Sequence, residues 1–365
     1  MTTTQTPLTP VDEAEAPDGI ELTPAGYWAA RAALGAGGRG RRGALARWEV
    51  LLVVLLGGVL VLNVLLSPYF WDAGSILDDT STFMEVGLMA LPMTLIIIAG
   101  HIDLSIASNG ALCAIIFATR FQAGWNVWAA AGLALLIGVV AGVANGLIVT
   151  KLRLPSLVVT LGTYALYRGL ANGLLGSGEV SSFPGAFAGI DTRYLPGTHV
   201  PAPLVIFAIA ALLVGLLLHT TVFGRYIYAV GNNVDASRYA GVAVDRIVIV
   251  LFGLSGFFAA LATLVLVSRL QTARSDIGTG FELQAITAAV LGGANIFGGE
   301  GSIPGTVLAV FIIGLLGNGM TLGNVPAEVQ TIAVGALLIL SILVPSLTKR
   351  ARTALSRRKG GGRSS

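Results

Sequence analysis

Charged residues are scarce in this sequence. Only 11% of its 365 residues are Asp, Glu, Lys or Arg, whereas 55% are hydrophobic, and the mean hydropathy is +0.82. A soluble domain of ordinary composition carries about 25% charged residues. Too little polar surface is therefore available to cover a water-soluble globule of this size, and the composition indicates an integral membrane protein.

Cysteine and lysine are also rare. The single cysteine, Cys113, can form neither an internal disulfide nor a cysteine-based metal cluster, and we expect no metal and no other cofactor. None of the three lysines, Lys151, Lys349 and Lys359, stands in the G-x-x-x-x-G-K-[ST] pattern of a phosphate-binding loop. If the protein uses ATP, a partner must bind it. The basic pI, near 9.2, comes from chain ends and short loops, so we expect no nucleic-acid partner.

Long apolar segments and 48 glycines are what the sequence has in abundance. A helix that spans a bilayer needs about 20 apolar residues, and glycine lets such helices approach closely. These features predict an all-α, polytopic membrane protein with about ten transmembrane helices. The apolar segments are 49–66, 83–100, 104–119, 128–150, 157–175, 203–221, 247–267, 282–297, 303–320 and 327–345.

The regions that flank these segments have a different composition. Residues 1–48 are polar or rich in Gly and Arg, which predicts a disordered N-terminal tail, and residues 347–365 form a basic C-terminal tail after the membrane domain at 49–346. Lys and Arg favour the cytoplasmic side of a membrane. We therefore expect both termini in the cytoplasm and the chain in the cytoplasmic (inner) membrane, with loop 222–246 inside and loop 176–202 outside.

Two apolar regions are interrupted by polar, glycine-rich residues, namely G-H-I-D-L-S at 100–105 and G-G-A-N-I-F-G-G-E-G-S at 292–302. Each interruption predicts either a tight turn between two helices or a discontinuous helix. Unwound backbone at membrane depth is tolerated only where protein or a wet cavity surrounds it. Paired interruptions in the two halves of a transporter often point to the solute site, so these residues are candidates for the solute path.

The longest polar stretch between apolar segments on the predicted inner side is 222–246. It predicts a short helix that Asn232 or Asn233 caps and whose first turn Asp235 favours. Small residues such as Ala236 and Gly241 give this helix a slim face, which suits a groove on a second protein. An ordinary amphipathic connector is the alternative interpretation of the same spacing.

Four stretches carry a resemblance to a known family. They are "IIAGHIDLSIASNGAL", "LVVTLGTYALYRGLANGL", "GRYIYAVGNNVDASRYAGVAVDRI" and "SRLQTARSDIGTGFELQAITAAVLGGANIFGGEGSIPGTVLA". With them, residues 50–345 resemble the sugar-type ABC permeases, and most closely the autoinducer-2 and rhamnose branch of that family. The sequence departs from the family at His101, where Gly is usual, and this bears on the turn because Gly takes positive φ at little cost.

The resemblance implies a type II-like importer permease that forms one half of a pore in membrane lipid. A second permease, identical or related, completes the pore, a cytoplasmic ABC ATPase drives it, and an extracytoplasmic solute-binding protein delivers a sugar or sugar-like solute of the autoinducer-2, rhamnose or ribose class. The resemblance also implies that the ATPase contacts loop 222–246. The candidate coupling residues are Gly224, Arg225, Asn233, Asp235, Ala236, Ser237, Arg238 and Gly241.

Polar residues within the apolar segments must face a partner or a wet path, because an unpaired polar group in lipid is costly. Asp103 suits three roles: the cap of the helix that follows it, a solute contact or a bond between helices. Arg168 also needs a partner, for which Glu179 is a candidate. The candidate path residues are Asp103, Ser105, Asn109, Tyr164 and Asn295.

Two other classes of protein stay open at this point. The G-L-S-G at 253–256 is a motif of intramembrane serine proteases, but every histidine lies in a loop or at the end of a segment, poorly placed to activate Ser255. An ion-coupled secondary transporter of a small neutral solute is the stronger alternative. The shortage of acidic residues within the segments argues against it.

Overall fold

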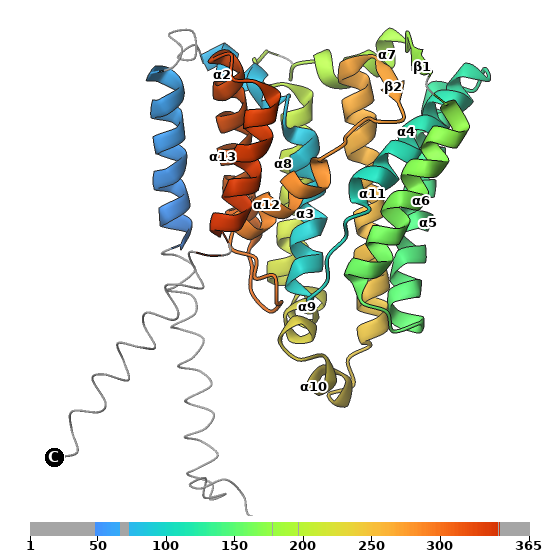
Figure 1. Ribbon diagram of the computed structural model, residues 1–365, viewed down its shortest axis with the longest axis vertical. Coiled ribbons are helices and arrows are strands. Elements are labelled where there is room, and N and C mark those ends of the chain that lie inside the picture. Colours follow the sequence, from blue (N-terminus) through green and yellow to red (C-terminus); the bar gives the residue numbers. More distant parts are fainter. Residues whose placement is uncertain (1–47, 66–72, 177, 196, 342, 344–365) are drawn as a thin grey trace, which may run out of the picture. The chain divides into compact units, whose positions relative to one another are not determined.

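The computed structural model describes residues 48–65, 73–176, 178–195, 197–341 and 343. Both predicted tails, apart from Trp48, lie outside these residues. Within them the chain is predominantly helical (Figure 1).

Each of the ten predicted apolar segments is helical over most of its length. Among the described residues, five helices are long and apolar enough to cross a membrane: Trp48–Leu65, α5 (Val127–Lys151), α8 (Ala202–Thr220), α11 (Val244–Leu270) and α13 (Ile303–Leu322). The other five are α3 (Met84–Ile98), α4 (Ile106–Gln122), α6 (Ser156–Leu175), α12 (Phe281–Leu291) and Ala327–Ser341.

Helix α12 departs most from the expected bounds. It has 11 residues and rises about 16 Å, roughly half of the hydrocarbon thickness of a bilayer. Residues 292–297 belong to the apolar segment, but they also begin the interruption predicted at 292–302, and in the structure they begin the turn to α13. Gly293 has a φ of +98°, a left-handed conformation that ends a helix and that glycine adopts at little cost.

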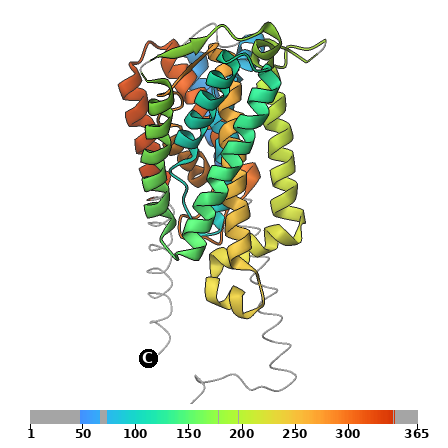
Figure 2. The same ribbon diagram turned by 90° about the vertical axis from the view of Figure 1, so that its right-hand side faces the viewer.

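Four shorter elements gather at one end of the bundle, the upper end in Figures 1 and 2. They are α2 (Ala73–Thr80), α7 (Gly185–Thr192), β1 (Glu179–Ser181) and β2 (Thr272–Arg274). The two strands are antiparallel, with Val180 opposite Ala273. This small sheet is a local exception to the all-α prediction, and it ties the 176–202 loop to the segment that leads into α12.

Helix α11 is the centre of the packing. In its most apolar stretch 72% of the residues are buried, against 17% in Trp48–Leu65. It runs along α5 and also contacts α3 and α4. Glycines permit the close approach of α5 and α11, as expected: a Cβ on Gly142 would collide with the carbonyl of Phe252, and one on Gly256 with the carbonyl of Gly138.

Side chains with local partners fix where several helices begin. Asn126 caps α5 by accepting a hydrogen bond from the N–H of Trp128 at 2.9 Å, and Ser302 caps α13 through the N–H of Gly305 at 3.2 Å. The helix Trp48–Leu65 is tied to the bundle at both ends. Trp48 Nε1 donates to the carbonyl of Leu291 at 3.0 Å and Asn63 Nδ2 to that of Leu315 at 2.7 Å.

Candidate solute path and coupling segment

The polar loop 222–246 folds into two short helices, α9 (Val222–Asn232) and α10 (Val234–Tyr239). Figure 1 places both at the end of the bundle opposite the small sheet. Thr221 caps α9 by accepting from the N–H of Gly224 at 3.2 Å. Asn233 caps α10 by accepting from the N–H of Ala236 at 2.9 Å, so the structure uses Asn233 for the cap predicted at 232 or 233.

The candidate coupling residues divide into exposed and buried ones. Gly224 is buried against the end of α8, where a Cβ would collide with the carbonyl of Leu218. Ser237 is buried too, and its hydroxyl donates to the carbonyl of Asn233 at 2.8 Å. The other candidates are exposed on the surface of the protein: Arg225, Asn233, Asp235, Ala236, Arg238 and Gly241.

Tyr239, the last residue of α10, was not among the candidates. Its side chain is 94% exposed. Aromatic residues are enriched at protein–protein interfaces, so an aromatic residue in a polar loop is the signal that could have found it.

An ion pair ties α10 to the start of α11, and a second ties the start of α11 to the end of α5. Asp245 lies 3.3 Å from Arg238 Nη2 and 3.5 Å from Lys151 Nζ, and all three side chains are more than a third exposed. Exposed pairs of this kind contribute little to stability. They therefore hold the loop only weakly.

Behind α9, the two predicted interruptions contact each other. The N–H of Gly299 donates to the carbonyl of Ile98 at 2.8 Å, and Tyr228 Oη donates to the carbonyl of Gly301 at 2.7 Å. Gly231 lies between them: a Cβ there would collide with the carbonyl of Ile98 and come within 2.6 Å of the nitrogen of Gly299. We call this meeting of residues 98–100, 228–232 and 298–301 the glycine junction.

From the glycine junction the chain runs through a non-helical segment, 99–105, to the start of α4 at about mid-height of the bundle (Figure 1). The backbone of Ile102 is satisfied by α6, because its N–H donates to Ser156 Oγ and its carbonyl accepts from Thr160 Oγ1, both at 3.2 Å. The positive φ of the turn, +82°, falls on Gly100, and His101 is not among the described residues with positive φ. The departure at His101 therefore leaves the turn unstrained.

Asp103 is 2% exposed and accepts three hydrogen bonds. Its Oδ1 accepts from the N–H and hydroxyl of Ser105, at 2.9 and 2.7 Å, and its Oδ2 accepts from Ser255 Oγ at 2.6 Å. Asp103 thus bonds the segment before α4 to α11, which is the interhelical role among the three weighed for it. It does not cap α4, because Ser105 is the N-cap residue of that helix and Asp103 bonds to Ser105 itself. The hydroxyl of Ser255 is directed to this carboxyl group.

The same bonds continue into α5 and α6. Asn145 Nδ2 donates to Ser105 Oγ at 2.8 Å, while Tyr167 Oη donates to Asn145 Oδ1 at 3.1 Å and to the carbonyl of Ala141 at 2.9 Å. We call Asp103, Ser105, Asn145, Tyr167 and Ser255 the interior polar network. It joins four helices, and all five side chains are buried.

The remaining path candidates lie elsewhere. Asn109 is buried and donates to the carbonyl of Gly138 on α5 at 3.2 Å. Tyr164 is half-buried on α6. Asn295 belongs to the turn beside the glycine junction, where its Oδ1 accepts from the N–H of Phe297 at 3.1 Å.

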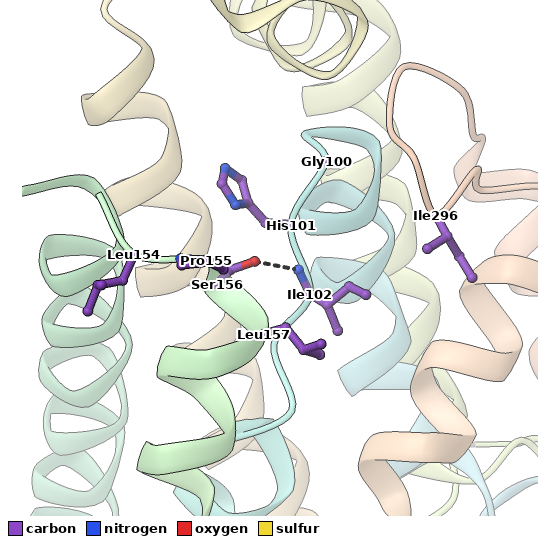
Figure 3. Close-up of a pocket in the computed structure, with 8 residues that line it drawn as sticks. All are labelled: Gly100, His101, Ile102, Leu154, Pro155, Ser156, Leu157 and Ile296. Atoms are coloured by element: carbon purple, nitrogen blue, oxygen red, sulfur yellow. Dashed lines mark hydrogen bonds between the residues drawn. The ribbon is translucent and has the colours of Figure 1, made fainter. Parts of the chain in front are cut away.

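A cavity of about 310 Å³ opens beside the non-helical segment 99–105. Its walls are residues 100–102, residues 154–157 at the start of α6, and Ile296. Figure 3 shows the ring of His101 between the segment 99–105 and the start of α6, with the bond from Ile102 to Ser156 at the base. The volume lies at the lower limit of about 300 Å³ for small-molecule sites.

Arg168, the cation in an apolar segment, contacts backbone rather than an acidic side chain. Its Nη1 donates to the carbonyls of Ser275 and Ile277, at 2.7 and 3.1 Å, in the turns between β2 and α12. Glu179, the expected partner, lies in β1 opposite Arg274. The guanidinium group thus satisfies carbonyls of backbone outside any helix.

Comparison with known proteins decides the family. Residues 75–342 match the family described as "Branched-chain amino acid transport system / permease component". The chain belongs to this permease family. It is therefore the permease subunit of an ABC importer, a multi-pass membrane protein and not an enzyme, and neither the protease nor the ion-coupled interpretation gains support.

Curated relatives agree over most of their length. The "Autoinducer 2 import system permease protein LsrD" of Klebsiella pneumoniae is 41% identical over 307 residues, which is 82% of this chain and 92% of the relative. The proteins of the same name from Enterobacter sp. and Yersinia enterocolitica are 38% and 39% identical over the same share of this chain, covering 93% and 92% of their own lengths. No solved structure matches the chain.

Proposed function

We propose that this permease carries a small, neutral, hydroxyl-rich solute of the autoinducer-2 class through a pore that a second permease completes. A cytoplasmic ATPase drives transport by acting on α9 and α10, and an extracytoplasmic solute-binding protein delivers the cargo at the end that carries the small sheet. Both termini and α10 lie on the cytoplasmic side in this proposal.

The observation that supports the coupling role is that α10 presents exposed charged and aromatic side chains in a chain that has few charged residues. In a sequence with 11% charged residues, the exposed side chains of Asp235, Arg238 and Tyr239 project from one short helix at the end of the bundle. Such a helix can dock on a motor protein, and α9, which precedes it, is packed tightly into the glycine junction.

The choice of cargo is supported by the relatives' names and by the chemistry of the interior. The side chains of the interior polar network are hydroxyls, one amide and one carboxyl group, and the cavity at 99–105 is lined by a hydroxyl, an imidazole and apolar groups. These groups suit hydroxyl-bearing solutes. The candidate path then runs past Asp103, Ser105, Asn109 and Tyr164 toward the cavity and Asn295.

A reconstituted transporter tests the proposal. We expect labelled autoinducer-2 to enter vesicles only with ATP and the solute-binding protein, and to be displaced by unlabelled autoinducer-2 better than by rhamnose or ribose. Displacement by leucine alone would instead assign an amino-acid cargo. Replacement of residues 234–239 by a Gly-Ser linker should abolish uptake, and uptake that survives this replacement or ATP depletion would contradict the proposal.

A further inference from the structure

Two routes lead from α9 and α10 into the bundle. One passes through the turn after α10 into α11, and the other through the inner face of α9 into the glycine junction. We propose that the glycine junction transmits the displacement that the ATPase imposes on α9 and α10 to the non-helical segment 99–105, with Tyr228 and Gly231 as positioning residues. This inference rests on the proposed coupling role of α9 and α10.

The route into α11 is the more exposed one. Gly241 is exposed in the turn, which a backbone hydrogen bond from the N–H of Val242 to the carbonyl of Ser237 closes at 3.0 Å, and the ion pair of Asp245 with Arg238 is also exposed. Water screens such pairs, and their long side chains move freely. We therefore expect this route to transmit less of a displacement of α10 than a packed interior does.

The route through α9 is buried and stiff. Ile227 and Val230, on the inner face of α9, are 0% exposed. At Gly231 the backbone of α9 lies directly against the carbonyl of Ile98 with no side chain between them. Tightly packed interiors compress little and transmit strain, so a displacement of α9 must move Ile98.

A displacement of Ile98 moves the segment that lines the candidate solute path. Ile98 is the last residue of α3, and the non-helical segment 99–105 that follows lines the cavity and contains Asp103. The hydrogen bond from Gly299 to Ile98 and the bond from Tyr228 to Gly301 draw the 292–302 turn into the same unit. A displacement of α9 therefore moves both segments that interrupt the apolar regions, 99–105 and 292–302. Packed contacts of this kind can switch between discrete arrangements.

The test measures ATP hydrolysed per molecule of labelled autoinducer-2 taken up, with the complete transporter in vesicles. Tyr228→Phe removes the bond to Gly301 but keeps the ring. Loss of one such bond should raise the ratio about two- to tenfold, while co-purification with the ATPase stays unchanged. Gly231→Ala should raise the ratio of ATP hydrolysed to solute taken up still further, or prevent assembly. If Gly231→Ala prevents assembly, the result for Tyr228→Phe still decides the test.

Two comparison variants make the result specific. Tyr226→Phe removes the same atom from the same helix at a position 42% exposed, and it should keep the wild-type ratio. Asp245→Asn weakens the route into α11 and should raise the ratio less than Tyr228→Phe. Equal ratios for Tyr228→Phe and Tyr226→Phe, or a larger rise for Asp245→Asn, would overturn the inference.

The same assay separates this inference from the proposed function. If the Gly-Ser linker at 234–239 abolishes uptake while Tyr228→Phe behaves like Tyr226→Phe, the coupling role stands and only the route through the glycine junction is wrong. If the linker leaves uptake intact, the proposed function itself fails.

Discussion

The chain leaves its helices twice within apolar regions, at 99–105 and at 292–302, and the two segments are held in different ways. Side chains hold the first: Ser156 and Thr160 satisfy the backbone of Ile102, and Asp103 collects three donors. Backbone contact holds the second, through bonds such as that from the N–H of Asn295 to the carbonyl of Glu300 at 2.9 Å. Glycines with positive φ, at 298, 299 and 301, allow this second arrangement.

The difference predicts opposite sensitivities. A segment held by polar side chains is damaged when their polar atoms are lost. A segment held by close backbone approach is damaged when even one methyl group is added. Both satisfy the same requirement, that backbone polar groups within a membrane find partners inside the protein.

The largest effect is expected from Asp103→Ala. Three donors lose their acceptor in a buried site, which should lower the free energy of unfolding by about 4 kcal/mol. Denaturant titration of the purified permease in detergent measures this. Asp103→Asn, which keeps the shape and one acceptor oxygen, should lose less than half as much, and a wild-type value for Asp103→Ala would contradict the account of the first segment.

Gly299→Ala tests the second segment. The new side chain meets a φ of +77° and lies 2.7 Å from Asn232 Oδ1, so we expect a loss of about 2–3 kcal/mol in the same titration. Gly162→Ala on α6 is the matched control, because no atom lies within 4 Å of its Cβ position. That variant should be neutral or stabilised by up to about 1 kcal/mol, and equal losses in both would remove the contrast.

Tyr167→Phe tests a side-chain hydrogen bond that lies outside both segments, 99–105 and 292–302. Its hydroxyl serves the interior polar network through Asn145 and the carbonyl of Ala141. Its removal should lower the free energy of unfolding by about 1 kcal/mol. Tyr239→Phe, at a fully exposed hydroxyl, should show no change; a similar loss there would mean that the titration does not report the network.

Arg238→Gln should have the smallest effect. The pair with Asp245 is exposed and takes part neither in the side-chain bonds of segment 99–105 nor in the backbone contacts of segment 292–302. Its loss should therefore change the free energy of unfolding by at most about 0.5 kcal/mol. The change should vanish at high salt, because salt screens exposed charges. A larger, salt-independent loss would show that the loop carries stability that the structure does not explain.

Local features were predictable from the sequence. The apolar segment 128–150 became α5 almost residue for residue, and the cap of α10 fell on Asn233, one of the two asparagines named for it. Length, apolar composition and capping chemistry act within a few residues, so a sequence displays them directly. The interruption at 292–302 was predictable as well, and α12 ends at Leu291, directly before it.

Partners distant in the chain were not predictable. Ser255 bonds to Asp103 across 152 positions, and Arg168 finds the carbonyls of Ser275 and Ile277 instead of Glu179. The spacing of these residues in the sequence does not predict that they pair. The strands β1 and β2 were missed for the same reason, since three residues carry no readable period.

The sequence by itself determined that this protein lies in a membrane, how many apolar helices it builds and where polar residues interrupt them, because hydrophobic burial depends on composition along short stretches. The tertiary structure alone decided that the two interruptions touch at the glycine junction and that Asp103 belongs to a network of four helices. Those facts depend on how closely particular backbones approach in space, which no local pattern encodes.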